Sequence, residues 1–351
     1  MSVVEIGLVN AYPVRIDVDY LQELLRIIQG RQRVALFFSE SMKDAIPVLT
    51  ESDAEIFYFP LPDSEGTKSA HVLTQVWDWL GASGFTRSDL IVAIGGGAVT
   101  DFAGFAAASW LRGIDWVAIP TTVAGMVDAA IGGKTGINSD YGKNLIGAFH
   151  SPREVLIDTH WLSTLSDRDF AAGLAEVVKA GFIADGEIIS LIGNKTLGEI
   201  RSSKEVTLEL IERAVQVKAD VVSSDFKESF DREILNYGHT FGHAIELDSK
   251  FSLRHGECVS IGMIFIAELA YSLGLMNQEL LDSHRRILGN LSLPTSYASR
   301  EWQPLLANMK LDKKSRGDLL RFVVVTEIGK TQRLEGPEES ALHAAYEKVC
   351  S

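Results

Sequence analysis

The sequence predicts a two-part fold, in which an α/β domain with a parallel sheet precedes a mostly helical domain. In the first part, short apolar runs typical of buried strands alternate with segments of helical periodicity, which is the pattern of a parallel α/β sheet. From about residue 163 onward, long segments of helical periodicity dominate. We therefore place an α/β domain at residues 1–160 and a helical domain at residues 161–351.

Four apolar runs in the first part have the composition of buried strands, at residues 33–38, 55–59, 89–94 and 116–119. Pro60 and Pro62 should end the second strand and Pro120 the fourth, because proline cannot donate to the ladder of a central strand. Between the second and third strands, residues 68–80 place apolar side chains at helical spacing. They should form a helix that stops at Gly81.

The second part should contain long helices, at residues 166–183, 204–223, 239–250 and 256–273. The longest apolar stretch of the chain, Cys258 to Met276, overlaps the last of them. This stretch carries Glu268 near its middle and small residues throughout, which favours a buried core helix over a membrane span.

The composition is that of a globular protein with room for two cores, since 46% of the 351 residues are apolar and 23% are charged. The net charge of −14 argues against nucleic acid and anionic membranes as partners, because both need a basic face. A small anionic substrate stays compatible, since a few lysines can reverse the field inside one cleft. With only two cysteines and no visible signal peptide, we expect a cytoplasmic protein.

Two glycine-rich turns are candidate anion-binding elements. Gly95–Gly97 follows an apolar strand and should open a helix, where N–H groups attract phosphate, although a plain tight turn has the same pattern. Gly132–Gly136 has the wrong spacing for a P-loop, because the first glycine of that motif would fall at Asp128. What is left is a loop that presents Lys134, which is either an anion ligand or a solvated lysine.

Three of the eight histidines fall within seventeen residues and predict a metal site or an acid/base site. His239 and His243 are four residues apart, so a helix puts both rings on one face, and spacing alone makes them the ligand pair. Thr240 stands where a zinc protease would need its catalytic glutamate, which disfavours that class. His255 follows beside a glycine.

Glu176 lies on an otherwise apolar helix face, three residues before Lys179. Burying a carboxylate is costly unless it pairs with a cation or binds a metal. A metal ligand and a simple Glu–Lys helix pair both fit this pattern. The other basic residues of the second part, taken one by one, are typical of surface charges.

Taken together, these motifs resemble the 3-dehydroquinate synthase family, and the resemblance covers almost the whole chain in the right order. The residues that carry it are Pro62–Lys68, Gly95–Gly97 with Asp101, Pro120–Thr122, Asp128–Asn138, Gly142–His150, Ala172–Lys179, Leu235–His243, His255–Glu257 and Asp312–Lys314. The resemblance implies a Rossmann-like NAD-binding domain joined to a helical domain that binds metal and substrate, and it implies a homodimer.

The resemblance also implies a role for each matching residue. The metal ligands, for zinc or cobalt, would be Glu176, His239 and His255, which differs from the pair that helix spacing favours. The NAD-binding residues would be Glu65, Lys68, Gly96, Gly97, Asp101, Thr121, Thr122 and Lys143. The substrate-binding residues would be Asp128, Lys134, Asn144, Lys179, Lys218, Arg232, Asn236, Lys313 or Lys314, and Arg112, which would reach the neighbouring subunit's phosphate pocket. The catalytic groups would be His243 beside the metal, Lys134, Lys143, Asn144, Lys179, Arg232 and Asn236.

The implied activity is that of a carbon–oxygen lyase of the shikimate pathway, which leads to aromatic amino acids. It converts 3-deoxy-D-arabino-heptulosonate 7-phosphate to 3-dehydroquinate and phosphate. NAD would take a hydride from the C5 carbinol and return it after phosphate has left by elimination. Ring opening and aldol closure would complete the reaction, with no net oxidation.

Three rival interpretations stay open at this point. A metal-dependent polyol dehydrogenase would release NADH and would not need anion-binding residues such as Lys134 and Lys218. A sister cyclase would close a sugar phosphate without a carboxylate, which the pair of Arg232 and Asn236 disfavours. A small-molecule sensor or scaffold on the same fold would not need intact metal and lysine positions.

Overall fold

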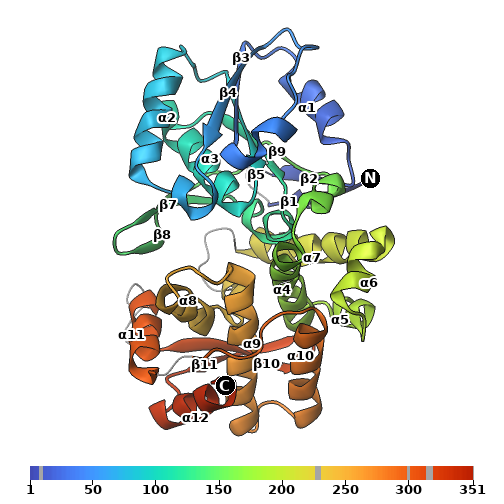
Figure 1. Ribbon diagram of the computed structural model, residues 1–351, viewed down its shortest axis with the longest axis vertical. Coiled ribbons are helices and arrows are strands. Elements are labelled where there is room, and N and C mark those ends of the chain that lie inside the picture. Colours follow the sequence, from blue (N-terminus) through green and yellow to red (C-terminus); the bar gives the residue numbers. More distant parts are fainter. Residues whose placement is uncertain (8–10, 226–230, 299–300, 314–318, 351) are drawn as a thin grey trace. The chain divides into compact units, whose positions relative to one another are not determined.

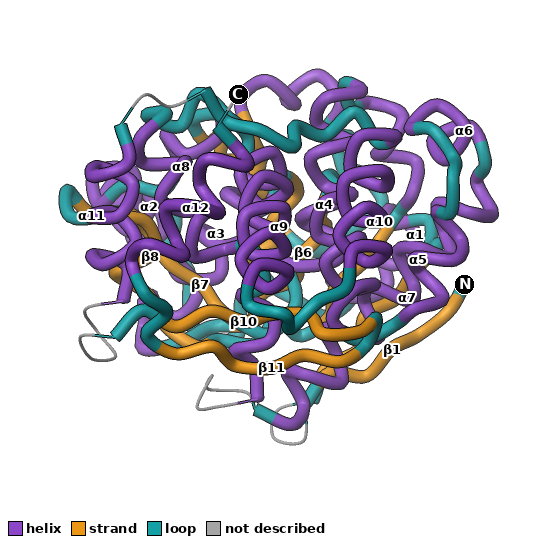
Figure 2. Tube along the Cα trace, turned by 90° about the horizontal axis from the view of Figure 1, so that it is seen from below, coloured by secondary structure: helices purple, strands orange, loops and turns teal. Residues whose placement is uncertain are grey.

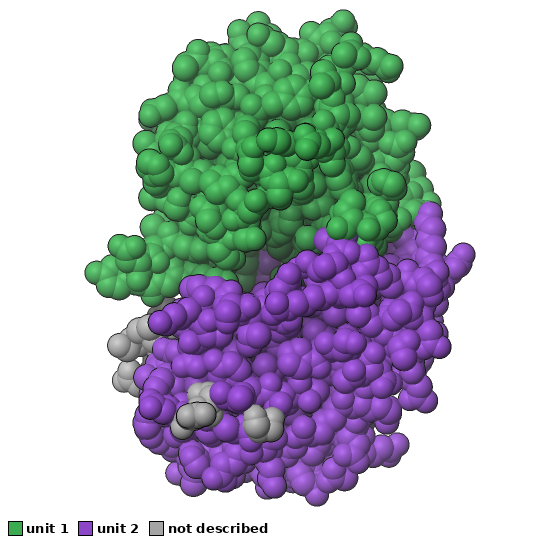
Figure 3. Space-filling view, viewed as in Figure 1, with its two compact units in different colours: residues 1–164, 218–227 green, residues 165–217, 228–351 purple. Residues whose placement is uncertain are grey.

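The computed structural model of the protein describes residues 1–7, 11–225, 231–298, 301–313 and 319–350. The chain forms two compact units, which Figure 3 shows in two colours. The first unit holds Met1–Thr164 and Lys218–Lys227, and the second holds Leu165–Val217 and Glu228–Ser351. The long segment of the first unit runs to Thr164, and the sequence analysis placed the domain boundary at residue 160. The first unit also includes Lys218–Lys227, which the sequence-based division gave to the helical domain.

The first unit is built on a seven-stranded sheet in the order β1-β2-β9-β6-β5-β3-β4 (Figure 1). Its strands are β1 (Ser2–Ile6), β2 (Tyr12–Ile16), β3 (Arg33–Ser39), β4 (Glu55–Leu61), β5 (Leu90–Gly95), β6 (Asp115–Pro120) and β9 (Glu154–Ile157). All neighbouring strands are parallel except β1 and β2. Every residue of β5 is buried, as expected for a parallel sheet with covered faces. The α/β prediction is confirmed.

The four predicted strands all form, with a correction at Pro60. β4 continues through Pro60 to Leu61, and Phe38 of β3 pairs with Pro60. This is tolerated because β4 is an edge strand, where the missing N–H of proline can fall on the side without a partner. The predicted helix stop at Gly81 is also wrong by one residue, because a single helical glycine costs only about 1 kcal/mol.

The helices of the first unit are α1 (Tyr20–Ile28), α2 (Ala70–Ala82) and α3 (Gly97–Ser109). α3 packs on β5 and β6, and α1 contacts β9 (Figure 1). Beside the main sheet, β7 (Lys134–Ser139) and β8 (Gly142–Phe149) pair as an antiparallel hairpin where the sequence analysis expected a loop. Gly136 and Gly147 face each other in the hairpin, and a Cβ on Gly147 would lie 2.2 Å from a carbonyl oxygen of β7. Glycine at these positions therefore allows the two strands to pair.

The second unit is mostly helical, and α9 lies at its centre. Its elements are α4 (Asp167–Ile183), α5 (Gly186–Ile192), α6 (Leu197–Ser202), α7 (Lys204–Ser224, whose residues from Lys218 onward belong to the first unit), η6 (Asp231–Asn236), α8 (His239–Asp248), α9 (His255–Ser272), α10 (Gln278–Asn290), α11 (Trp302–Lys313), β10 (Arg321–Glu327), β11 (Lys330–Glu335) and α12 (Glu339–Val349). α9 packs against α4, α8, α10, α12 and β10 (Figure 2). The residues from Gly256 to Ala267 are all buried, so the prediction of a core helix is confirmed.

The four long predicted helices correspond to α4, α7, α8 and α9, with ends shifted by one or two residues. Ser166 caps α4 by accepting from the N–H of Asp169, which explains why that helix starts one residue late. The antiparallel pair of β10 and β11 was not predicted, so the helical domain also contains a small sheet. Among the described residues, no helix combines the length and apolar character needed to span a bilayer.

Candidate functional site

The three metal ligands that the family resemblance implies lie together in the second unit. Glu176 belongs to α4, His239 begins α8, and His255 begins α9. Oε1 of Glu176 lies 3.6 Å from Nε2 of His239 and 3.3 Å from Nε2 of His255. One ligand atom from each residue falls within 4.8 Å of the other two. Tetrahedral ligands with bonds of about 2.0–2.1 Å are about 3.3 Å apart, so the cluster fits one small divalent ion.

The crossing of α4 and α9 brings Glu176 to His255. Gly256, the residue after His255, packs so closely on α4 that an added Cβ would lie 1.7 Å from the carbonyl oxygen of Ala172. Ala172 is one helical turn before Glu176, so this backbone contact places the two ligands side by side.

The crossing of α8 and α9 brings in His239. A Cβ on Gly262 of α9 would lie 1.9 Å from the carbonyl oxygen of Gly238, the residue before His239. Gly238 has a φ of +78°, a conformation that favours glycine, and it caps the start of α8. Glycines beside both histidines therefore allow three helices to come close enough for their side chains to share an ion.

Glu176 and Lys179 are deeply buried charges, with side chains only 2% and 3% exposed. They form an ion pair within α4, so the predicted Glu–Lys helix pair exists alongside the ligand geometry. Burial alone would raise the pKa of the Glu176 carboxyl, but Lys179 and His239 outweigh it and hold the pKa well below its usual range. Both carboxylate oxygens are buried and accept no well-formed hydrogen bond among the described residues. The site thus offers an ionised carboxylate with lone pairs available to a cation.

The two imidazoles are oriented through their Nδ1 atoms. Nδ1 of His239 lies 3.1 Å from the carbonyl oxygen of Tyr237, and Nδ1 of His255 lies 2.9 Å from Oε1 of Glu246. When the rings are neutral, each acceptor keeps the proton on Nδ1, so the lone pair of Nε2 is left for a cation held between the ring and Glu176. Burial lowers the pKa of His239 well below its usual value. At His255 burial acts in the same direction, but the two nearby carboxylates outweigh it and raise the pKa to about 10.

His243 lies beside this cluster and belongs to a different ligand group. The ring centroids of His239 and His243 are 5.4 Å apart, yet within the described part of the chain no ligand group contains both. A second, overlapping group consists of His243, Glu246 and His255. The two rings favoured by helix spacing are thus neighbours, but the ligand group that contains His239 is the one with Glu176 and His255.

The triple-glycine turn and two threonines gather at the carboxyl ends of β5 and β6 in the first unit. The N–H of Thr121 donates to the carbonyl oxygen of Gly95 at 2.9 Å. Gly96 precedes α3 and lies so close to Thr122 that an added Cβ would be 3.2 Å from its methyl carbon. The first turn of α3, which begins at Gly97, carries no acidic residue, so its positive dipole end can attract an anion. This edge of a parallel sheet is where such folds bind nucleotides.

Four further residues expected to bind NAD form a connected charge cluster in the same unit. Nζ of Lys68 lies 2.6 Å from Asp101, and Nζ of Lys143 lies 3.5 Å from Glu65. Asn138, to which the sequence analysis gave no role, joins the two pairs. Its amide donates to Glu65 at 2.7 Å, and its N–H donates to the carbonyl oxygen of Lys68 at 2.9 Å. An asparagine inside the quoted glycine-rich motif was the available signal, because its side chain both donates and accepts.

The substrate-binding residues expected in the first unit lie on three segments. Asp128, in a short helical turn, forms an ion pair with Lys218 of α7. Lys134 begins β7 and is exposed. Asn144 is exposed in β8 with a φ of +55°, and its N–H donates to Oδ1 of Asn138 at 3.0 Å. The structure connects Asn144 to the charge cluster through Asn138.

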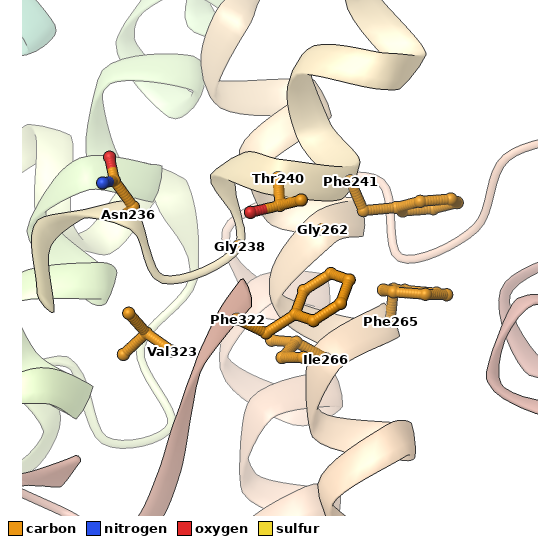
Figure 4. Close-up of a pocket in the computed structure, with 9 residues that line it drawn as sticks. All are labelled: Asn236, Gly238, Thr240, Phe241, Gly262, Phe265, Ile266, Phe322 and Val323. Carbon is orange, nitrogen blue, oxygen red and sulfur yellow. The ribbon is translucent and has the colours of Figure 1, made fainter. Parts of the chain in front are cut away.

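Arg232 and Asn236 both belong to η6 in the second unit, in different surroundings. The Arg232 side chain is buried, so a substrate could reach its guanidinium only after local rearrangement. Asn236 lines a shallow hollow and points away from the rings of Phe241 and Phe265 (Figure 4). Apolar side chains, among them Phe241 and Phe265, make up most of the lining of this hollow.

The remaining expected residues are Arg112, Lys313 and Lys314. Arg112 is exposed at the end of a short helical turn after α3. Lys313 ends α11. Lys314 lies outside the described residues.

Comparison with known proteins assigns the chain to a family. The family model described as 3-dehydroquinate synthase N-terminal matches residues 58–172, and the model described as 3-dehydroquinate synthase C-terminal matches residues 173–315. The 3-dehydroquinate synthase of Streptomyces avermitilis is 49% identical over 345 residues, which are 97% of this chain and 95% of the relative. That of Paenarthrobacter aurescens is 48% identical over 347 residues, which are 98% of this chain and 93% of the relative.

A solved structure shows the same fold. The 2-epi-5-epi-valiolone synthase of Streptomyces hygroscopicus subsp. jinggangensis, with NAD+ and Zn2+ bound, has a TM-score of 0.89 at 27% identity, and the match covers 96% of both chains. Its fold therefore matches this chain along nearly its full length. On the strength of both family models and of relatives with about half their residues identical, the chain belongs to the 3-dehydroquinate synthase family.

Proposed function

We propose that the protein converts 3-deoxy-D-arabino-heptulosonate 7-phosphate to 3-dehydroquinate and phosphate, and that it uses NAD and a divalent metal, zinc or cobalt. The observation that carries this proposal is the cluster of Glu176, His239 and His255, because three protein ligands leave a coordination position open for a substrate oxygen. The curated relatives' name supports the substrate, and the solved relative with NAD+ and Zn2+ supports the cofactor pair.

Glu176, His239 and His255 would hold the metal, which when bound lowers the pKa of a coordinated carbinol. Lys179 keeps Glu176 ionised and offers a buried ammonium group next to the cluster. His243, whose ring centroid lies 5.9 Å from that of His255, would hold or move a proton beside the reacting carbinol.

NAD would bind to the first unit and, when bound, take up a hydride and give it back. The residues that would hold it are Glu65, Lys68, Gly96, Gly97, Asp101, Thr121, Thr122 and Lys143. The glycine turn and the start of α3 would bind the pyrophosphate through backbone N–H groups. Lys68 is only 3% exposed and paired with Asp101, so we assign it to shaping this cluster rather than to direct charge contact with phosphate.

The anionic substrate would be held by Asp128, Lys134, Asn144, Lys179, Lys218, Asn236 and one of Lys313 and Lys314. Basic side chains suit a substrate with both a phosphate and a carboxylate, because charge-assisted hydrogen bonds to such groups are strong. Lys218 is held by Asp128, so an incoming anion would exchange one carboxylate partner for another. Arg232 would join this set once its buried guanidinium becomes accessible.

We also propose a homodimer in which Arg112 serves the neighbouring subunit. Leu111 and Arg112 have φ values of +48° and +66°, and strain of this kind persists where the surroundings require it, often at functional contacts. Light scattering on the purified protein should give twice the mass of one chain. The mass of a single chain at working concentration would contradict this proposal.

The test of the activity is to supply the heptulosonate phosphate, NAD and zinc to the purified protein. Phosphate should be released with no net NADH. Steady accumulation of NADH would support a polyol dehydrogenase instead. Turnover restricted to sugar phosphates without a carboxylate would support a sister cyclase.

A further inference from the structure

Glu246 is a buried carboxylate to which the proposed function gives no role. It lies in α8, seven residues after His239, and its side chain is 4% exposed. A carboxylate at this depth is costly unless a donor or a cation compensates it. Its Oε1 lies 2.9 Å from Nδ1 of His255, which is a hydrogen-bond distance.

We infer that Glu246 is a positioning residue of the metal centre, which orients His255 and strengthens it as a ligand. This inference deepens the proposed metal site and rests on it. A carboxylate that accepts the Nδ1 proton of a ligating histidine fixes the ring and makes the coordinating nitrogen more basic. The two histidines then differ, because His239 donates to the neutral carbonyl of Tyr237 whereas His255 donates to a charged group.

The exposure of the two rings explains why His255 needs such a partner. The His255 side chain is 38% exposed, while that of His239 is 11% exposed. Without Glu246, the ring could turn toward water, and this freedom would have to be lost each time an ion binds.

The alternative is that Glu246 itself binds an ion, together with His243 and His255. In that case His255 would use Nδ1 as its ligand atom. Its Nε2 would then be left 3.3 Å from the buried carboxylate of Glu176 without an ion between them. The separation of 2.9 Å between Glu246 and Nδ1 is also shorter than the roughly 3.3 Å expected for two ligands of one tetrahedral ion. Both distances favour the positioning role.

The test measures zinc binding by the full-length apoprotein, independently of activity, by competition with a chromophoric chelator. Glu246→Ala should bind one ion per chain about 10- to 100-fold more weakly than the unsubstituted protein, the range for partners of ligating histidines. Glu246→Gln has the same shape and can still accept from Nδ1, so its loss should be smaller. Glu268→Gln on α9 is the matched control, because it makes the same charge change at a glutamate paired with Arg285, and its affinity should be unchanged.

Cobalt-substituted protein gives a second measurement that a merely structural role would not affect. The exchangeable Nδ1 protons of the two ligating histidines should appear as separate paramagnetically shifted proton signals. Glu246→Ala should lose the signal of His255 to exchange with water and keep that of His239, whereas Glu246→Gln should keep both. Glu246→Gln also keeps the test valid should the alanine variant fail to fold.

Three outcomes distinguish the positioning role of Glu246, a ligand role for Glu246 and failure of the proposed metal site. Zinc affinity that is equal in Glu246→Ala and the unsubstituted protein would overturn the positioning role. Two ions per chain, falling to one in Glu246→Gln, would make Glu246 a ligand and would also overturn it. Absence of zinc binding by the unsubstituted protein would instead contradict the proposed metal site itself.

Discussion

The two units build their candidate binding sites in different ways. In the first unit, much of the expected NAD site is backbone at the ends of β5 and β6 and at the start of α3, so a local turn sets its geometry. In the second unit, the expected metal site consists of side chains from α4, α8 and α9, and glycines at the helix crossings set its geometry. Metal binding by the second unit should therefore respond more strongly than NAD binding by the first to changes in helix packing and in buried charge.

The largest expected effect comes from removing a metal ligand in the second unit. Glu176→Gln and His255→Gln should each weaken zinc binding by more than the roughly 100-fold limit seen for outer partners, and phosphate release should fall with metal content. Glu176→Gln should also lower the melting temperature, because it leaves the buried Lys179 unpaired, which costs about 3–5 kcal/mol. Metal content by atomic emission and calorimetry check both statements. Retained metal in either variant would show that the ligand set is wrong.

The next effect tests the helix crossing itself. In Gly256→Ala the new methyl group would meet the carbonyl oxygen of Ala172, which belongs to a helix backbone and cannot move aside. Overpacking of this kind lowers the free energy of unfolding by about 1–3 kcal/mol, and we expect a loss at the upper end of this range or above it. Zinc binding should weaken as well. Gly289→Ala in α10 is the control, since nothing lies within 4 Å of its added Cβ. The control should be stabilised by about 0.5–1 kcal/mol in denaturant titrations. Equal stability of the two variants would contradict the packing argument.

Local pattern was enough to predict the glycine turn and the strands around it, while its NAD-binding role came from the family resemblance; the metal cluster needed contacts between distant segments. The glycine turn and the strands before it follow from residues that are adjacent in sequence. Helix spacing selected His239 and His243, because a shared helix face is all that spacing can report. Glu176 comes from another helix. The burial argument left it as either a metal ligand or half of a Glu–Lys pair, and the family resemblance alone joined it with His239 and His255 in one ligand set.

The features that were missed depend on long-range contacts or on a burial argument that was not applied. The β7–β8 hairpin depends on two glycines that face each other across strands, and no periodicity reports such a pairing. Glu246 stands in the quoted histidine motif, three residues after His243, so the two share a helix face. The argument used for Glu176, that a buried carboxylate needs a cation or a donor, would have selected Glu246 as well.

The dependence of stability on pH should also distinguish the units, because His284 is buried in the second, and none of the described histidines of the first is buried. Its Nδ1 donates to the carbonyl oxygen of Leu280 at 2.7 Å, so its Nε2 accepts from the hydroxyl of Tyr237 at 2.8 Å. Tyr237 in turn orients His239. Burial lowers the pKa of His284 to about 4.

The sign of this effect follows from where the proton binds. As pH falls below about 6.5, the unfolded chain protonates its histidine, while the folded chain resists until about pH 4. Stability should therefore fall across this window, by up to about 3 kcal/mol from this one group. Urea titrations from pH 7 to pH 4 should show a flatter profile for His284→Gln than for the unsubstituted protein. Parallel profiles would contradict the assignment.

The smallest expected effect is in the first unit, at the glycine turn. A Cβ at Gly97 would lie 2.9 Å from the Cβ of Ala129, so either the start of α3 or the short helical turn that carries Ala129 must shift. We expect Gly97→Ala to cost about 1–2 kcal/mol of stability and to weaken NAD binding about tenfold, since the start of α3 moves with it. Gly66→Ala, with ordinary contact at 3.7 Å to Pro62, should change neither quantity. NAD titration by calorimetry measures the first variant against the second. A loss of zinc affinity in Gly97→Ala as large as in Gly256→Ala would contradict the contrast between the two units. It would mean that the expected NAD site and the metal cluster do not depend on separate local packing.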